Sequence, residues 1–448
     1  MPWVHAENAD GASFDVSGCP ITALTLEPLR PYTDQLRHLT ATSLSTKEYG
    51  AVQALLKATM PRLEQLRVSV DTAAEDGQTS MPHNVPEPVD LPPTRFPALR
   101  TLMLEGVRAS LGPLVASRLW HLEITNKSSK SQGLALLQFI NCIGSFKCLE
   151  KLYLSNCFSL ATVDGCRPRE PFSATRLMFV FIKDHPPIIS RILSALIIPA
   201  RARVELVGNM RGAPPHLCFA AFSAMLPDDK RCLPVLQNLW SLDVYHAPEA
   251  CYFTGTTASE EVLDLSVVTD ALHNPELRPS RGELFDRMIH GVRGIFPGSP
   301  IERLVFVGDI DFVAAEAWVS CLARFPLLRE LEVDDVDLRS SPNKVIAALM
   351  QPSGMHPEAL PVCPQLESLA LYGDISSLSL LDDLRKCLSW RQERLGGRRK
   401  TRLRELHAGL YCNHDMSGPL LEKHKVALAR FAVKTDIEVI EAHGHRQR

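Results

Sequence analysis

The most regular feature of the hydrophobic pattern is an aliphatic triplet spaced as L-x-x-L-x-L. The clearest copy lies in residues 148–157, which read C-L-E-K-L-Y-L-S-N-C. Its last two leucines alternate with other residues at period two, so both point to one face of a short strand. Further copies begin at Leu63, Leu99, Leu119, Leu239, Ile301, Leu328, Leu366 and Leu403, and weaker ones span residues 21–26, 177–182 and 204–207.

Helical spacing precedes several of these triplets. Ala315, Trp318, Leu322 and Phe325 lie on one face of a predicted helix, and residues 52–56, 284–292 and 381–388 carry similar apolar faces. Prolines 61, 97, 326 and 364 stand just before a triplet, where a fixed φ separates the helix from the strand. Each unit therefore reads as helix, turn and strand. One unit cannot bury both of its apolar faces, so neighbours must stack.

The repetition predicts an α/β fold of the leucine-rich-repeat solenoid (horseshoe) class. Parallel strands line the concave face and helices the convex face, with irregular repeats. The alternative is an ordinary α/β domain in which the leucine pattern recurs by chance.

The uneven spacing of the triplets sets the expected domain organisation. Residues 1–20 are an N-terminal extension, residues 21–440 form one irregular repeat domain, and residues 441–448 are a C-terminal tail. Segments rich in turn-forming residues predict inserted loops near 71–95, 161–174, 208–230 and 246–281, with a possible strand at 262–268 in the last.

Composition narrows the function classes. The chain has 448 residues, of which 45% are hydrophobic and 22% charged, with a net charge of -3. This balance favours a folded protein and argues against nucleic-acid binding over the whole surface. No secretory leader or stretch long enough to cross a bilayer is expected, so we expect no membrane partner. The 12 scattered cysteines then read as reduced thiols, and the expected location is cytoplasmic or nuclear.

The sequence offers no catalytic, cofactor-binding or metal-binding motif. Phosphate-binding loops, dinucleotide-binding turns and paired-histidine zinc motifs are not found. Cys142, Cys148, Cys157 and Cys166 are spaced too widely for a zinc site. Two looser groups, His216 with Cys218 and Cys232, and His414 with Cys412 and Asp415, are better explained as free thiols beside loop histidines.

The candidate site residues are those that alternate with the buried leucines and so point out from the concave face. Tyr153, Tyr245 and Tyr372 are the expected anchors, because tyrosine is enriched at binding hot spots. Glu123, Asp243, Glu332 and Asp334 indicate a partner with a basic patch. Met103 and His121 complete the predicted protein-binding set.

The chain resembles the leucine-rich-repeat region of F-box proteins of the fungal type. Phe96-Pro97, Phe325-Pro326, Cys363-Pro364 and Met60-Pro61 ahead of the triplets carry the likeness. The resemblance implies a substrate receptor of a ubiquitin ligase, with a target protein on the repeats and a Skp-type adaptor on the F-box. An F-box segment of the form L-P-x-E-I/L is not found before the first repeat, and residues 26–29 (L-E-P-L) match it poorly.

The leading hypothesis is therefore a non-enzymatic protein-interaction scaffold. A second hypothesis places an enzyme or ligand site in 208–281, in a pocket lined by His216, Asp243 or His246. A third treats the chain as a nuclear protein that uses the basic run in 391–404. That run contains Arg391, Arg394, Arg398, Arg399, Lys400, Arg402 and Arg404.

Overall fold

A computed structural model of the chain has two compact α/β units. It describes residues 3–8, 10–17, 21–71, 88–126, 136–158, 170–210, 220–246, 251–258, 260–268, 278–296, 298–335, 341–353, 360–374, 379–396, 402–412 and 418–441. Unit 1 contains residues 1–209 and 224–234, and unit 2 contains residues 210–223 and 235–448. Where the sequence suggested one repeat domain over 21–440, the contacts therefore divide the chain into two parts.

The sheet of unit 1 begins with an antiparallel hairpin and continues as a parallel run. Strands β1 (Trp3–Asn8) and β2 (Ser13–Ser17) pair antiparallel, and β1 also pairs antiparallel with β3. From β3 onward each strand is parallel to the next. The run consists of β3 (Leu36–Leu44), β4 (Gln65–Val70), β6 (Thr101–Glu105), β8 (His121–Thr125), β9 (Lys151–Ser155), β11 (Phe179–Asp184) and β13 (Arg203–Asn209).

Unit 2 has the same plan. The hairpin of β15 (Cys251–Thr256) and β16 (Glu261–Val268) pairs antiparallel through β15 with β14 (Ser241–His246). A parallel run then follows from β14. It consists of β17 (Arg303–Gly308), β18 (Glu330–Asp335), β19 (Ser368–Asp374), β20 (Leu403–Cys412) and β21 (Ala432–Glu441).

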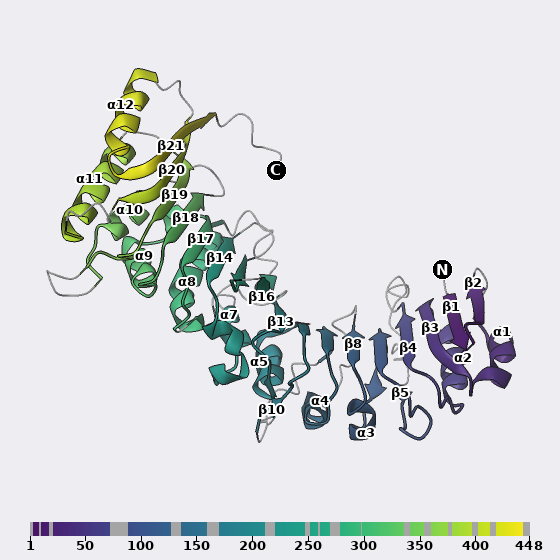
Figure 1. The fold of residues 1–448 in the computed structure, drawn as a ribbon. Helices are drawn as coiled ribbons and strands as arrows, with labels where there is room; N and C mark the ends of the chain where they lie inside the picture. The colour runs from purple at the N-terminus through teal and green to yellow at the C-terminus, as the bar shows by residue number, and fades with distance from the viewer. Residues whose placement is uncertain are drawn as a thin grey trace. The chain divides into compact units, whose positions relative to one another are not determined.

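Helices connect many of the parallel strands. In unit 1 the connecting helices are α2 (Thr46–Leu56), α3 (Pro113–Ala116), α4 (Leu136–Ile143) and α5 (Pro186–Ser194). Helix α1 (Ala23–Leu26) and the 3-10 helix η1 (Glu27–Tyr32) lie between β2 and β3, ahead of the parallel run. In unit 2 the helices are α8 (Arg278–Ile295), α9 (Ala315–Leu322), α10 (Asn343–Leu349), α11 (Ser379–Arg394) and α12 (Gly418–Leu428), with η8 (Ile310–Phe312). The short helix α7 (Ala221–Met225) and the 3-10 turns η4 (Lys230–Cys232) and η5 (Pro234–Gln237) precede β14. Figure 1 places these elements along the chain.

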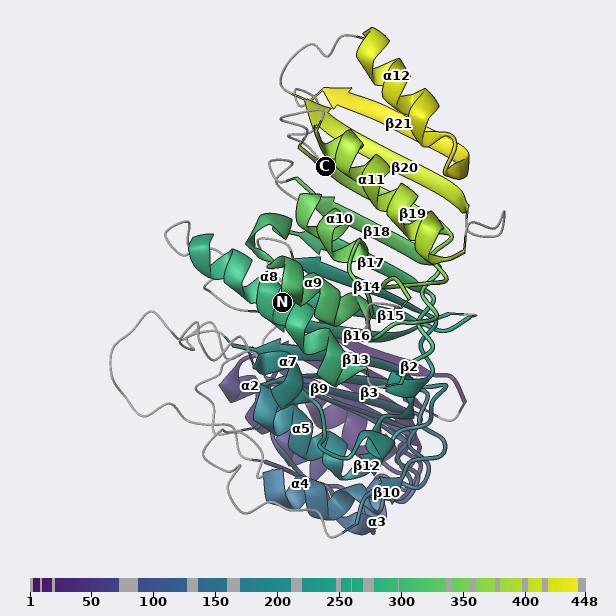
Figure 2. The ribbon, with the colours of Figure 1, turned by 90° about the vertical axis from the view of Figure 1, so that its left-hand side faces the viewer.

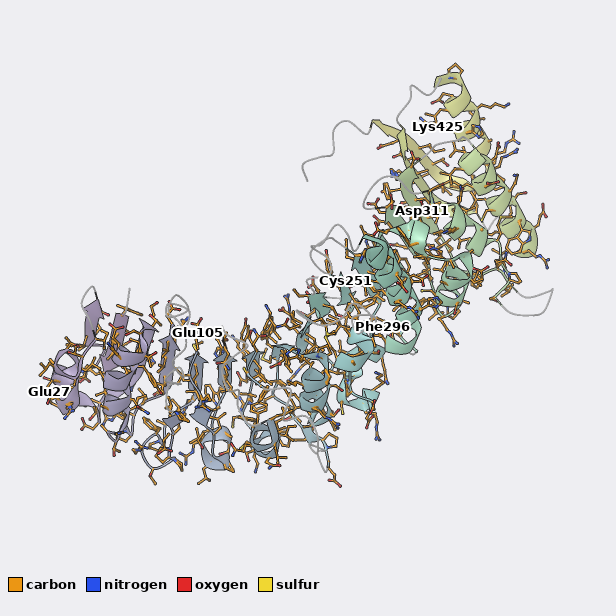
Figure 3. The ribbon with its side chains drawn as sticks, turned by 180° about the vertical axis from the view of Figure 1, so that it is seen from behind. Glu27, Glu105, Cys251, Phe296, Asp311 and Lys425 are labelled. Atoms are coloured by element: carbon orange, nitrogen blue, oxygen red, sulfur yellow. The ribbon has the colours of Figure 1, made fainter. Side chains whose placement is uncertain are left out.

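The helices of unit 2 cover one face of its sheet. In Figure 2, α9, α10 and α11 lie side by side in front of the strands. The inward side chains of the strands pack against them, as when the Phe306 ring of β17 meets Trp318 of α9 edge to face at 5.1 Å. Phe253 of β15 packs in the same way on Phe296, which follows α8; Figure 3 labels Phe296 together with Cys251 at the start of β15.

A repeated backbone contact fixes where most of the parallel strands start. The carbonyl of the residue before one strand accepts hydrogen bonds from two consecutive amides at the start of the next. Trp120 O, for example, accepts from the amides of Glu150 and Lys151. The accepting carbonyls are those of Glu64, Arg100, Trp120 and Glu150 in unit 1 and of Trp240, Glu302, Arg329 and Glu367 in unit 2. This contact satisfies the backbone groups at the turn into each strand and keeps the triplets in register.

Most predicted strands and helices are confirmed. The triplets from Leu63 to Leu403 each lead into a parallel strand, and the weaker copies at 177–182 and 204–207 form β11 and β13. The copy at 21–26 was wrong, because these residues contain α1, whose Thr22 side chain caps the helix. The first parallel strand is instead β3, where Leu36, Leu39 and Ala41 are buried in the triplet positions.

The expected inserts differ in part from the structure. The described residues within 246–281 are mostly not loop, because they supply β15, β16 and the start of α8; the possible strand at 262–268 is confirmed as part of β16. Cys251, Phe253, Leu263 and Leu265 bury their side chains at alternate positions, which stabilises this hairpin. Much of 71–95, 161–174 and 208–230 lies outside the described residues. In the first segment β5 (Val89–Asp90) pairs with the later strand β7 (Ala109–Ser110), and in the second β10 (Phe172–Ser173) pairs with the later strand β12 (Leu196–Ile197). The expected N-terminal extension 1–20 supplies β1 and β2 of the sheet.

Candidate binding face

The face of each sheet turned away from the buried leucines carries partly exposed side chains, and we call it the open face. All nine predicted binding residues lie at such outward positions and are partly exposed. Met103, His121, Glu123 and Tyr153 belong to unit 1, and Asp243, Tyr245, Glu332, Asp334 and Tyr372 belong to unit 2. The structure therefore describes two sets of candidates, one on each sheet.

Five aligned residues, one on each of five neighbouring strands, form a row across the open face of unit 1, and two of them are an aromatic pair. Met103, Glu123, Tyr153, Phe181 and Glu205 are register partners on β6, β8, β9, β11 and β13. The Tyr153 and Phe181 rings are stacked, with centroids 4.2 Å apart and planes 7° apart. A carboxylate thus stands on each side of the stacked rings, at Glu123 and Glu205.

Histidines on the open face of unit 1 lie next to carboxylates. His121 Nε2 is 3.8 Å from Glu123, and burial lowers the pKa of this imidazole despite the opposing pull of Glu123. On the hairpin end of the sheet, His5 Nδ1 is 2.6 Å from Asp15 and His38 Nδ1 is 3.2 Å from Glu7. These pairs are part-exposed, so each contributes little to stability, but they leave the face rich in hydrogen-bonding groups.

The open face of unit 2 is crowded with carboxylates around one arginine. Arg303 of β17 donates to Asp243 at 3.1 Å and to Ser241 at 3.2 Å. Its guanidinium also lies 3.8 Å from Glu332 and 3.9 Å from Glu330. Burial raises the pKa of Asp243, while Arg303 opposes that shift. Arg303 therefore compensates the negative charge of the three carboxylates around it, those of Asp243, Glu330 and Glu332.

A second aromatic pair lies farther along the same face. The Tyr245 and Tyr252 rings are stacked, with centroids 4.8 Å apart and planes 17° apart. Val307 is the register partner of Tyr245 on the next strand, and Asp334 is the register partner of Val307. Burial, with added repulsion from Glu332 and Asp335, raises the pKa of Asp334 to about 6. Its Oδ1 is buried and has no hydrogen-bond partner within the described part of the chain.

Two aromatic residues of these faces, Phe181 and Tyr252, are not among the predicted binding residues. Phe181 is the outward neighbour of Ile182, so the weak triplet at 177–182 already carried its signal. Tyr252 lies on an antiparallel strand that has no leucine triplet. Arg303 lies at an outward position next to Leu304 of a predicted triplet, but its contact with three neighbouring carboxylates depends on strand order, which one triplet does not reveal.

The second hypothesis places an enzyme or ligand site in 208–281, in a pocket lined by His216, Asp243 or His246. Asp243 points to the open face, whereas His246 is 2% exposed on the helix side of the same strand, where it stacks on Phe285. Its Nδ1 lies 3.7 Å from the buried Asp309. His216 lies outside the described residues. Since Asp243 and His246 occupy opposite faces of β14, the structure does not bring them together.

The basic run at 391–404 does not form one exposed patch. Arg391 is 5% exposed and donates to the carbonyls of Val362 at 2.6 Å and Cys363 at 2.7 Å, with Leu349 at 3.3 Å. Burial lowers the pKa of its guanidinium. Arg394 lies against the Trp390 ring, and Arg404 is 3.5 Å from Glu330. Arg398, Arg399 and Lys400 lie outside the described residues.

The cysteines that the structure describes are free thiols, most of them buried. Cys157 donates through Sγ to the carbonyl of Ile124 at 2.9 Å, and burial raises its pKa well above the usual range. Cys232 is buried in η4. Within the described ranges no three His, Cys, Asp or Glu side chains gather as metal ligands. The groups around Cys218 and His414 lie largely outside those ranges.

One observation on the helices and one comparison with known proteins complete the description of the site. No described helix is both long and apolar enough to cross a bilayer. Neither a protein-family model nor a curated protein sequence matches the chain. The functional argument therefore starts from the open faces themselves.

Proposed function

We propose that this chain is a non-enzymatic leucine-rich-repeat protein that binds a partner protein through the open faces of its sheets. In this proposal each unit is a stack of helix–strand repeats headed by an antiparallel hairpin. The support for the repeat class is the shared carbonyl contact at the starts of β6, β8, β9, β11, β17, β18, β19 and β20 and the matched register of the triplet leucines.

One observation carries the binding proposal. On both open faces a pair of stacked aromatic rings stands beside carboxylates, at Tyr153 with Phe181 and at Tyr245 with Tyr252. Aromatic rings that are held in place by a neighbour lose little conformational freedom on binding and supply a large contact area. The flanking acids add selectivity for a partner of opposite charge.

A Skp-type adaptor is not part of this proposal. The F-box of the resembling family is a short helical bundle, whereas the described residues before β3 form the β1–β2 hairpin, α1 and η1. A nuclear role for the basic run is likewise left aside, because Arg391 is committed to backbone carbonyls inside unit 2.

The proposal is tested by site-specific photocrosslinking in the cells that make the protein. A benzophenone amino acid replaces Phe181 or Tyr372 on the open faces, and Leu137 of α4 or Trp390 of α11 on the helix side serves as the matched position. We expect the open-face positions to capture a shared partner that the helix positions do not capture. Adducts only from Leu137 and Trp390 would place binding on the helices and end the proposal.

A further inference from the structure

At one end of the open face of unit 2, a negative charge has no neighbouring cation among the residues that the structure describes. Arg303 lies among Asp243, Glu330 and Glu332, so these carboxylates already share a cation. Asp334 forms no ion pair among the residues that the structure describes. It lies on the far side of Glu332 along β18, and Val307 separates it from Tyr245.

The orientation of the Tyr245 ring follows from its stack. Neighbouring strands lie about 4.8 Å apart, and the Tyr245 and Tyr252 centroids are 4.8 Å apart with nearly parallel planes. The ring normals therefore run across the strands rather than along them. One face of Tyr245 is covered by Tyr252, so its other face is turned toward β17 and looks over Val307.

Three side chains thus define a position for a planar cation. Val307 is a short aliphatic floor, Tyr245 offers a ring face on one side, and Asp334 offers a carboxylate on the other. An arginine guanidinium carries N–H donors on opposite edges, so one edge can face the aromatic ring by cation–π attraction while the other edge donates to the carboxylate. A lysine ammonium is a compact point charge without two such edges and gains less from this arrangement.

We propose that the open face of unit 2 binds an arginine-bearing segment of a partner protein, with one guanidinium over Val307 between Tyr245 and Asp334. The inference rests on the proposed protein-binding function and names the chemistry of the partner. Charge complementarity selects this occupant, since Asp243, Glu330, Glu332 and Asp334 lie on the same face, where the described ion pairs come from Arg303 and, to Glu330, also from Arg404.

The state of Asp334 supports the same assignment. Its carboxyl group is desolvated, has neighbouring negative charges and has a buried oxygen without a hydrogen-bond partner in the described ranges. A carboxylate in these surroundings gains more from an added cation than a fully solvated one, because water stabilises it less. A bound guanidinium would hold this carboxyl in its ionised form.

The test uses the purified full chain and fluorescence anisotropy. The probe is a short fluorescein-labelled peptide of alternating arginine and glycine, compared with the same peptide carrying lysine or citrulline, the neutral isostere of arginine. We expect the affinity order arginine, lysine, citrulline, and weaker binding at raised salt. Equal binding of the citrulline peptide would overturn the inference.

Matched variants locate the site. Asp334→Asn keeps the shape and removes the charge, and should weaken arginine-peptide binding about tenfold, the effect of losing one charge-assisted hydrogen bond. Tyr245→Leu should weaken arginine binding more than lysine binding. Glu316→Gln removes one exposed carboxylate from α9 on the helix side and should leave affinity unchanged. Thermal unfolding of each variant confirms that it folds.

The outcomes separate this inference from the broader function. If Phe181 and Tyr372 capture a partner but Asp334→Asn and Glu316→Gln bind the arginine peptide equally, the arginine assignment fails and protein binding stands. If the peptide requires Asp334 while no open-face position captures a partner, the cation site stands and the scaffold proposal fails.

Discussion

The rings of Tyr153 and Phe181 lie parallel across two strands, with 4.2 Å between their centroids and 7° between their planes. Each ring is part-exposed, and the register partners beyond them are Glu123 and Glu205. The stacked pair, which we call the platform, is thus a rigid and partly solvent-exposed aromatic surface on the open face of unit 1. Its two rings hold each other in place.

The platform predicts an energetic coupling between the two rings. Tyr153→Ala and Phe181→Ala should each destabilise the protein, and the double variant should lose less than the sum of the two, by about 0.5–1.5 kcal/mol. Urea unfolding of the four proteins measures this coupling. As a control, Phe181→Ala combined with Tyr245→Ala, in the other unit, should be additive. A coupling of zero between Tyr153 and Phe181 would contradict the stacked arrangement.

Asp184 predicts a pH dependence of stability. It is 2% exposed, and burial raises its pKa to about 6 although it accepts hydrogen bonds from the amides of Cys157, Phe158 and His185. Because the folded pKa lies above the unfolded value, the folded state holds the proton more tightly. The stability that this proton supplies is complete below about pH 4 and is lost as the pH rises through about 6, by up to ~3 kcal/mol.

The Asp184 prediction is measured as the difference in unfolding free energy between the wild type and Asp184→Asn from about pH 4 to about pH 7. Asparagine has one carboxamide oxygen where three amides need acceptors, so the variant should be less stable at every pH. The gap should narrow as the pH rises and then level off. A gap that stays constant over this range would show that Asp184 is already ionised in the folded protein at about pH 4.

Arg391 predicts a large stability effect from a residue in a charged run. Arg391→Met removes the donors to the carbonyls of Val362, Cys363 and Leu349, and should cost about 2–4 kcal/mol because these acceptors are left buried. Arg385→Met on the same helix should cost no more than ~0.5 kcal/mol, since the ion pair of Arg385 with Asp382 is exposed to solvent. Similar losses for both variants in thermal unfolding would refute the difference in role.

Gly308 predicts that a single methyl group is not tolerated where β17 ends. A Cβ at this position would lie 2.7 Å from the Phe285 ring of α8, closer than packed atoms approach. Gly308→Ala should therefore destabilise the protein by about 1–3 kcal/mol, the usual cost of overpacking. Gly294→Ala in α8 meets nothing within 4 Å and should be neutral or stabilising by up to ~1 kcal/mol. Equal melting temperatures for the two variants would contradict the contact.

The parts of the fold that the sequence predicts are those set by local patterns. The triplets mark most parallel strands because each buries two alternate aliphatic side chains, and the helix faces at 52–56 and 315–325 follow from helical period. Strand β3 escaped notice because Ala41 replaces the third large aliphatic residue. Strand β15 escaped because an antiparallel strand with Thr and Gly carries no triplet. Residues 262–268 of β16 were expected as a possible strand, but only pairing reveals the register of the hairpin.

The candidate site divides in the same way. Outward positions follow from alternation, so all nine residues could be named in advance. Which of them touch depends on strand order, and that places Phe181 on Tyr153, Tyr252 on Tyr245 and Arg303 among the carboxylates. Arg391 is buried because it donates to the carbonyls of Val362 and Cys363, which are distant in sequence. Its basic neighbours in sequence had instead suggested an exposed basic run.

The two-amide contact at most strand starts also bears on how such a chain can change over time. The intervals between strands vary, from the short step between β6 and β8 to the long steps around β18, β19 and β20, yet each of these steps ends with two amides bound to the carbonyl that precedes the neighbouring strand. An insertion or deletion in a connecting segment therefore alters the helix side while the outward residues keep their alignment. Repeat duplication, insertions and deletions can alter the helix side of this protein without changing the side chains that its open faces present to a partner.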